Sequence, residues 1–282
     1  MKLFSNVIMA FDGNYNYSKY WKYASRAWQE GIGVNPILLV ITEKGQEVKI
    51  EDTGYGKIIY DHFLDFSICP KFMQICLMRM WYMLKMDGVN IMADLDAIPL
   101  SKRRLVDEVP DEGNEPFYWL YAGFYGKYNQ KISWFHASSA VTYAKIFGVD
   151  INCTFEEFVK RAFELTSEYT ELPKGQYGVP YWALDEVLLT KLTVWNKPES
   201  LKVVDIQVPQ AKGPGASSYL WVTKKEKFRE SWMRTGHYVH AHKYNPNDDN
   251  LRNQLEYMLN LAFGFGYELP ENYVNPNQVK AR

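Results

Sequence analysis

Cysteine is scarce in this sequence, and neither sign of charge is in excess. The 282 residues contain three cysteines, Cys69, Cys76 and Cys153, whose spacing fits neither a metal site nor a disulfide framework. We therefore expect a reduced, intracellular protein. Lysine and arginine number 32 against 33 aspartates and glutamates, with no long run of one sign. The basic stripe of a nucleic-acid-binding surface is absent, so we expect no nucleic-acid partner.

Long hydrophobic runs and glycine-rich loops are also missing. No stretch approaches the roughly 18 apolar residues of a membrane span, and the apolar stretch after Met1 is too short for a signal peptide. These absences predict a soluble, cytoplasmic protein without a transmembrane segment. Asp12-Gly13-Asn14, which follows the first apolar run, does not resemble the glycine-rich loop of dinucleotide-binding or P-loop proteins.

Aromatic residues, by contrast, are abundant. They make up 16% of the chain and include 21 tyrosines and 9 tryptophans. Tyr and Trp combine a flat apolar face with a polar tip, which suits stacking on bases and sugar rings. Much of this aromatic content must still form an ordinary core.

The order of the apolar segments predicts an α/β fold. Apolar runs at residues 7–11 and 36–42 are typical of strands. Between them, apolar residues at helical intervals predict a helix over residues 17–29, ended by Gly31 and Gly33. This alternation indicates βαβ units with a mainly parallel sheet.

Later segments continue the pattern of strands and helices. We expect a possible strand at residues 57–60, a helix at 70–87, strands at 116–125 and 131–141, and a helix at 155–166.

Two aspartates follow the apolar run Ile91-Met92-Ala93. In an extended chain positions two apart share a face, so Asp94 and Asp96 would point the same way at the end of a strand. Ligands bind at that end in open α/β sheets. Two like charges repel unless a cation lies between them, and a hard divalent cation with substrate phosphates on its far side would satisfy both. The alternative is an exposed exit from the strand with two solvated aspartates.

Arg79 is the unusual residue of the helix expected at residues 70–87. It lies within an apolar stripe whose other members are Phe72, Ile75, Cys76, Met83 and Met86. A guanidinium on an apolar face is costly unless it meets a carboxylate or a phosphate. We expect Arg79 to pair with the aspartates that follow the next strand, or to reach phosphates. A snorkelling arginine at the edge of the stripe is the alternative.

Two further segments carry candidate functional groups. His136 follows an aromatic pair and precedes the small residues 137–140, which would let a ligand approach the backbone or would pack a tight core strand. Asp185 and Glu186 would open a helix, where acidic groups favour the positive end of the dipole. Alternatively, one of these carboxylates lies beside the reacting carbon of a substrate.

A histidine-rich segment lies near the C-terminus. In a strand over residues 237–243, His240 and His242 share a face and Lys243 points away. Neutral imidazole is a good ligand for Mn²⁺ or a partner for a phosphate oxygen. A surface pair of histidines is the alternative.

Taken in order, these features resemble the GT-A fold of nucleotide-sugar-dependent glycosyltransferases over most of residues 3–245. Three stretches resemble the retaining family 6 enzymes, which include the histo-blood-group transferases. These stretches are Met78-Arg79-Met80 before Asp94-Leu95-Asp96, then His136-Ala137-Ser138, and last Trp182 with Asp185-Glu186, Leu189, Lys191 and Asn196-Lys197-Pro198.

The resemblance implies an α/β, GT-A-like fold with a mixed central sheet, in one continuous globular domain. Residues 1–100 would form a Rossmann-like nucleotide-sugar-binding half that ends in Asp-x-Asp. Residues 101–282 would form the acceptor-binding and catalytic half. Mn²⁺ or Mg²⁺ would be held by Asp96, with Asp94 binding directly, through water or on the ribose, and His240 or His242 completing the metal shell.

The implied reaction is transfer of a sugar from a nucleoside-diphosphate sugar, with UDP favoured, to a glycan hydroxyl. Asp12 and Tyr15 would hold the base, His136 would contact the donor, and Lys243 or Arg79 would neutralise a phosphate. Asp185 or Glu186 would activate the acceptor hydroxyl in an inverting enzyme, or stabilise oxocarbenium character in a retaining one. The sequence does not decide between these outcomes.

Two other classes of protein compete with this hypothesis. A sugar nucleotidyltransferase would be expected to carry a glycine-rich, basic loop after the first strand, where this chain has Asp12-Gly13-Asn14. A non-catalytic carbohydrate-binding protein would explain the aromatic residues but would not need Asp94 and Asp96.

Overall fold

The computed structural model describes most of the chain. The described residues are 3–11, 18–43, 48–107, 109–113, 115–125, 130–167, 184–206, 219–221, 238–240, 249–271 and 273. Within 219–221 and 238–240 the backbone alone is described.

An eight-stranded sheet forms the centre of the molecule, in the order β3-β4-β2-β1-β5-β8-β7-β9. Neighbouring strands from β4 to β5 are parallel, whereas β3 and β8 run antiparallel to their inner neighbours and β9 is parallel to β7. The bounds are β1 Asn6–Phe11, β2 Asn35–Thr42, β3 Lys49–Thr53, β4 Gly56–His62, β5 Val89–Ala93, β7 Phe117–Tyr125, β8 Gln130–Ser139 and β9 Val203–Ile206. The predicted α/β fold with a mixed central sheet is confirmed.

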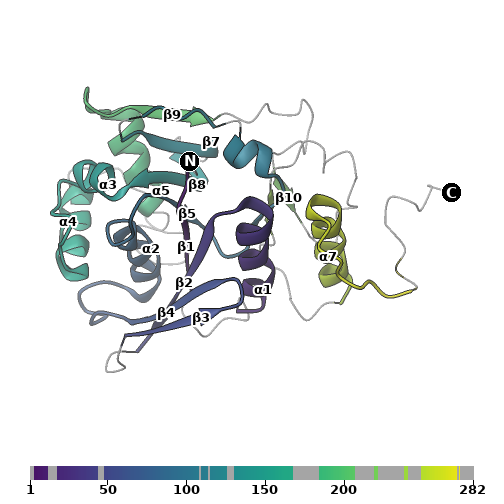
Figure 1. Cartoon of the computed structure of the whole chain (residues 1–282). Helices are drawn as coiled ribbons and strands as arrows, with labels where there is room; N and C mark the ends of the chain where they lie inside the picture. The colour runs from purple at the N-terminus through teal and green to yellow at the C-terminus, as the bar shows by residue number, and fades with distance from the viewer. Residues whose placement is uncertain are drawn as a thin grey trace.

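Helices cover both faces of this sheet (Figure 1). On one face lie α1 (Ser18–Arg26), which continues as the π-helix η1 (Ala27–Ile32), and α7 (Asp249–Phe263). The opposite face carries α2 (Lys71–Tyr82), α3 (Ala140–Phe147), α4 (Phe155–Ser167), α5 (Leu184–Thr190) and the π-helix η3 (Lys191–Trp195). A further π-helix, η2 (Arg103–Asp107), adds Leu105 to the core on the α1 side.

The central strands are largely apolar because both of their faces are buried. In β1, Val7 and Met9 pack in the core on the α1 side, whereas Ile8 packs in the core on the α2 side. In β5, Ile91 and Met92 divide between the two cores in the same way. Such continuous apolar runs are what parallel strands covered by helices require.

A second, three-stranded sheet links distant parts of the chain. Its order is β10-β11-β6, with bounds β10 Tyr219–Trp221, β11 Tyr238–His240 and β6 Ala97–Pro99. The central strand β11 is parallel to β10 and antiparallel to β6. Segments near residues 98, 220 and 239 are thereby joined by backbone hydrogen bonds.

The helix predicted at residues 17–29 does not stop at Gly31. It continues through η1 to Ile32, and Gly33 ends it with a left-handed φ of 86°. Gly31 is inside the helix for a packing reason: a Cβ atom there would lie 2.8 Å from the ring of Phe263 on α7. The glycine lets the two helices approach closely.

The helix predicted at residues 70–87 ends earlier, at Tyr82, and the expected apolar stripe is wrong at Phe72 and omits other buried residues. Phe72 is exposed, although it was placed in the stripe. The buried side chains of α2 are instead Met73, Gln74, Leu77, Met78, Arg79, Met80 and Tyr82. The physical reason is that α2 packs against β1 and also against α4 and α5, so that burial extends around much of its circumference.

Candidate functional site

The candidate site lies where the strand order of the large sheet reverses. From β1 the chain passes to β2 and β4 on one side, and then returns to β5 on the other side of β1. Because β1 and β5 are parallel, their carboxyl ends lie at the same edge of the sheet. Ligands of open α/β sheets bind in the crevice at such a point. Asp94 is the first residue after β5.

The two aspartates of Asp-x-Asp are arranged around a tight turn. The backbone N–H of Ala97 donates to the carbonyl oxygen of Asp94 at 3.1 Å. This turn carries the chain from β5 in the large sheet to β6 in the small one, and Asp96 is buried within it. The expected extended chain through Asp94 and Asp96 is therefore wrong, and the argument that extended geometry puts both side chains on one face does not apply.

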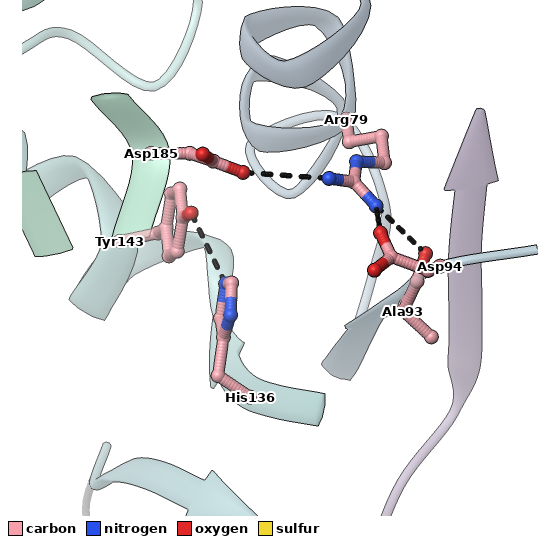
Figure 2. A network of polar contacts seen from close by, with 6 residues as sticks. All are labelled: Arg79, Ala93, Asp94, His136, Tyr143 and Asp185. Carbon is pink, nitrogen blue, oxygen red and sulfur yellow. Dashed lines mark hydrogen bonds and ion pairs between the residues drawn. The ribbon is translucent and has the colours of Figure 1, made fainter. Parts of the chain in front are cut away.

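Arg79 joins this turn to α5. Its Nη1 donates to the carbonyl oxygen of Ala93 at 3.1 Å and to Oδ1 of Asp94, and its Nη2 donates to Oδ2 of Asp185 at 3.4 Å (Figure 2). The residue is only 8% exposed. Of the alternatives raised by the sequence, the structure has the pairing with carboxylates and not the snorkelling arginine.

The carboxylates outnumber the positive charge at this point. Burial raises the pKa of Asp185, although the charge of Arg79 opposes the shift. Burial also raises the pKa of Glu186 well above its ordinary value, with the charges of Asp185 and Asp94 adding to the effect. Two carboxylates contact the one guanidinium, and Glu186 adds a third carboxylic group within reach of their charges, a balance that favours a bound proton or a bound cation.

Asp185 and Glu186 occupy the first turn of α5, as predicted. Asp185 therefore has both of the roles considered for it. Its backbone lies in the first turn of α5, and its carboxylate contacts Arg79. The helix dipole stabilises negative charge in this turn. Trp182, from the same stretch of family resemblance, lies outside the described residues.

His136 lies in the core behind these carboxylates. Its ring is fully buried and lies nearly parallel to the rings of Phe117, at 5.4 Å between centroids, and Tyr143, at 5.9 Å. Its Nε2 is 3.3 Å from the hydroxyl of Tyr143 (Figure 2). Burial, with a smaller effect of Arg79, lowers the pKa of His136 to about 3, so that the ring is neutral at ordinary pH. The predicted contact of His136 with a donor stays a prediction.

Tyr143 and Cys76 also lie near the cluster, and the sequence analysis did not select them as site residues. The charge of Asp185 raises the pKa of Tyr143, after a larger effect of burial. Burial likewise raises the pKa of the Cys76 thiol, with Asp185 as the next cause. An aromatic residue or a cysteine in an apolar helix gives the same sequence pattern as an ordinary core residue, so only the structure reveals their proximity to the site.

The histidine-rich segment approaches Asp-x-Asp through the small sheet. Pairing of β11 with β6 sets the backbone of His240 opposite Ala97, the residue directly after Asp96. His242, Lys243, Asp12 and Tyr15 all lie outside the described residues. Among the side chains that the structure describes, no three of the types His, Cys, Asp and Glu are grouped so that they could hold a metal ion.

The chain matches no protein-family model and no curated protein sequence.

Its structure is similar to those of three glycosyltransferases. GlyE of Streptococcus pneumoniae TIGR4 has a TM-score of 0.40 and 13% identity, over 71% of this chain and 45% of GlyE. A glycosyltransferase involved in glycosylation of the major capsid of PBCV-1 has a TM-score of 0.42 and 10% identity, over 90% of this chain and 98% of that enzyme. The galactosyltransferase LgtC, in complex with donor and acceptor sugar analogues, has a TM-score of 0.46 and 13% identity, over 94% of this chain and 98% of LgtC. The chain thus spans less than half the length of GlyE.

No described helix has both the length and the apolar character that crossing a membrane would require.

Proposed function

We propose that this protein is a glycosyltransferase that moves a sugar from a nucleoside-diphosphate sugar, with UDP favoured, to a hydroxyl group of a glycan. One observation carries the proposal. The buried guanidinium of Arg79 holds the carboxylate after β5 and the carboxylate that opens α5 together, at the edge where the strand order reverses. Ligand binding at such an edge is general for open α/β sheets, and paired carboxylates serve glycosyl chemistry.

Mn²⁺ or Mg²⁺ would be held by Asp94 and Asp96, with His240 or His242 completing the shell. Oxygen and imidazole suit such an ion as ligands, and the excess of carboxylates over positive charge around Arg79 supports the proposal. When bound, the ion would neutralise the developing charge of the departing diphosphate. Asp12 and Tyr15 would bind the base, Lys243 or Arg79 a phosphate, and His136 the donor.

The two carboxylates of α5 would act at the sugar carbon. Glu186 has a raised pKa and would accept the proton of the acceptor hydroxyl. Asp185 is paired with Arg79 and would support the positive charge that develops on the sugar ring. Both the retaining and the inverting outcome are compatible with this assignment. The anomeric configuration of the product, compared with that of the donor, distinguishes them.

Thermal shift with nucleotides tests the proposal most directly. UDP, GDP, CDP and several nucleotide sugars should each be added with and without Mn²⁺. We expect a UDP ligand to raise the Tm only when Mn²⁺ is present, because a ligand that binds the folded state stabilises it. Asp96→Asn should remove this shift, whereas Asp111→Asn, an exposed residue before β7, should keep it.

Product analysis separates the proposed activity from its rivals. Release of the nucleoside diphosphate from a donor supports glycosyl transfer, whereas release of pyrophosphate from a nucleoside triphosphate and a sugar phosphate would identify a nucleotidyltransferase. A protein that shows neither product and binds no nucleotide in the thermal-shift panel is not a glycosyltransferase of the proposed kind.

A further inference from the structure

The large sheet ends, on one side, in a strand with an open outer edge. β3 is the last strand there, with β4 as its neighbour (Figure 1). Ile50 in β3 and Val48 directly before it are 60% and 55% exposed, the highest values among the large hydrophobic side chains that the structure describes. An open strand edge with exposed apolar side chains is a template for pairing with another chain.

The turn between β3 and β4 determines which backbone groups face this open edge. Thr53 lies opposite Gly56, and two residues connect them. The pair that flanks a two-residue turn exchanges both of its backbone hydrogen bonds, and such pairs alternate along an antiparallel ladder. The odd-numbered residues of β3 therefore direct their N–H and C=O groups to β4, whereas Ile50 and Asp52 direct theirs outward.

The side chains of β3 divide between an apolar face and a charged face. Ile50 lies opposite the buried Ile59 of β4, which belongs to the core on the α2 side, and Val48 shares this face because it is two positions away. Lys49 and Glu51 occupy the other face. Their side chains are exposed, and Nζ of Lys49 is 3.7 Å from Oε2 of Glu51. The open edge thus combines apolar side chains with charges of both signs.

Charge selects one register for antiparallel pairing with a second copy of this strand. The outward backbone groups of the two copies must meet, so Ile50 can lie opposite residue 48, 50 or 52 of the second copy. Opposite residue 48, Lys49 would meet Lys49, and opposite residue 52, Glu51 would meet Glu51. Like charges directly opposite each other destabilise a ladder. Opposite residue 50, each Lys49 meets the Glu51 of the other copy.

We propose that the protein forms a symmetric dimer in which the β3 strands of two copies pair antiparallel about Ile50. Ile50 packs against Ile50 across the two-fold axis, and two pairs of Lys49 with Glu51 form on the other face. Val48 lies opposite Asp52, a pair without charge conflict. Both copies use the same edge, so association stops at the dimer.

The dimer joins the two eight-stranded sheets into one. Because the two β3 strands run antiparallel, the carboxyl ends of the two β5 strands lie at opposite edges of the joined sheet. Neither candidate site lies at the contact, since three strands separate β3 from β5. The dimer is therefore independent of the proposed function.

Sedimentation velocity of the full chain tests whether the dimer forms. The contact consists of one strand from each copy, which is small for a specific interface, so we expect a reversible dimer with a Kd of roughly 10–100 μM. The mean mass should rise from one copy toward two copies between about 1 and about 500 μM. A mass of one copy at every concentration overturns the inference, and so does growth beyond two copies.

Charge reversal tests the register. Lys49→Glu and Glu51→Lys should each weaken the dimer at least about tenfold, because each substitution puts like charges opposite each other in both pairs. An equimolar mixture of these two variants should restore the dimer, because one chain is then acidic at both positions and the other chain is basic at both. Both side chains are exposed, so the variants should fold.

Lys160→Glu is the matched control for charge reversal. Lys160 is exposed on α4, where its Nζ lies 2.7 Å from Oε1 of Glu156. The substitution changes the net charge as much as Lys49→Glu does, but it should leave the Kd of the dimer unchanged. If both variants of β3 dimerise as well as the control, or if mixing them restores no dimer, the contact lies elsewhere and the inference is wrong.

Cysteine cross-linking measures the register independently. In a hydrogen-bonded antiparallel pair the two Cα atoms lie about 5.5 Å apart, which a disulfide can span. Oxidation of Ile50→Cys should give a covalent dimer. Val48→Cys should stay uncrosslinked, because the two copies of this position are four residues, about 14 Å, apart along the strands. The unchanged chain controls for Cys69, Cys76 and Cys153. A cross-link at position 48 and none at position 50 overturns the proposed register.

Discussion

Arg79 carries a charge that its surroundings must neutralise. It is buried, and it contacts Asp94, Asp185 and the carbonyl oxygen of Ala93. Its Nε has no hydrogen-bond partner among the described residues. The planar guanidinium of arginine can make all of these contacts from one side chain. The compact ammonium group of lysine could not make them together.

Replacing Arg79 by methionine should destabilise the protein in a pH-dependent way. The substitution removes the cation and leaves Asp185 buried, so we expect a loss of about 3 kcal/mol in the free energy of unfolding at pH 8. Without Arg79 the folded-state pKa of Asp185 rises further above its unfolded value. A carboxyl group whose pKa is raised by folding favours the folded state when it is protonated, so the deficit should shrink at pH 5. Urea unfolding at both pH values measures the difference.

Arg252→Met is the control for that experiment. Arg252 pairs with Asp249 on the exposed surface of α7, at 3.1 Å. Exposed pairs contribute little, so a loss below about 1 kcal/mol that is the same at both pH values is expected. If Arg79→Met lowers the free energy of unfolding equally at both pH values, the loss comes from packing and not from the missing charge.

His136 makes a second prediction at this scale, on acid stability. Its folded pKa of about 3 lies below the unfolded value of about 6.5. Between these values the unfolded chain binds a proton that the folded protein does not, so stability falls as the pH decreases from about 6.5 toward 3, and this contribution is constant above 6.5. The slope is about 1.4 kcal/mol per pH unit.

Unfolding of His136→Asn between pH 7 and pH 5 tests this prediction. The variant should be less stable at pH 7, because the stacked ring and its contact with Tyr143 are lost, yet its stability should fall less steeply with decreasing pH. Parallel pH profiles for the two proteins would contradict a neutral, buried His136.

Glu186 should show its raised pKa in the kinetics. If Glu186 accepts the proton of the acceptor, its ionised form is the active one, so kcat/KM should rise with pH through that pKa. Glu186→Gln should lower kcat by about 10²–10⁴-fold and remove this rise, with donor KM little changed. Normal turnover in the variant would assign Glu186 to opening α5 alone.

At the scale of elements, the contact between η1 and α7 depends on the absence of one side chain. Gly31→Ala would put a Cβ atom 2.8 Å from the Phe263 ring. Helix propensity alone predicts a gain of about 1 kcal/mol for this change. The clash should outweigh it and lower the free energy of unfolding by about 1–3 kcal/mol.

Two comparisons separate the clash from other effects of the substitution. Gly54→Ala should be nearly neutral, since a Cβ there meets no atom within 4 Å. Combining Gly31→Ala with Phe263→Leu should recover part of the loss. Additive effects of the two changes would place the cost of Gly31→Ala elsewhere than at Phe263.

The elements that the sequence revealed are those buried on both faces or amphipathic in a simple way. The strands beginning at Asn6 and Asn35 are continuous apolar runs in the sequence. In α4, apolar residues recur at helical intervals. The antiparallel strand β3, Lys49–Thr53, was not predicted, because it is an edge strand with charged, exposed residues and no apolar period. The stripe on α2 was incomplete because several elements cover that helix, and it wrongly included the exposed Phe72.

The site was predictable where burial made a residue costly. Arg79 was identified from the cost of a guanidinium on an apolar helix, and the structure has it beside the carboxylates. The turn at Asp94 was not predictable, because an apolar strand followed by Ala-Ile-Pro reads as one extended element although the chain changes sheets there. Tyr143 gave no signal apart from its apolar helix.

At the scale of the molecule, both sheets combine strands from the two sides of residue 100. In the large sheet β5 pairs with β8, and in the small sheet β6 pairs with β11. Asp94 and Asp185 come from these two parts of the chain and meet at Arg79. The candidate site therefore depends on the assembly of both parts.

The central position of β1 has a consequence for how the chain folds as it is synthesised. One edge of β1 can pair with β2 once the first 42 residues have emerged, but its other edge waits for β5, and Asn6 pairs with Asn90 across 84 residues. Until then the nascent chain exposes an unpaired apolar strand edge, which other chains can join. Asp94 takes its place when this edge closes, whereas Asp185 can meet Arg79 only after the chain has been made through α5, so the nascent chain passes the stage of the open β1 edge before the candidate site is complete.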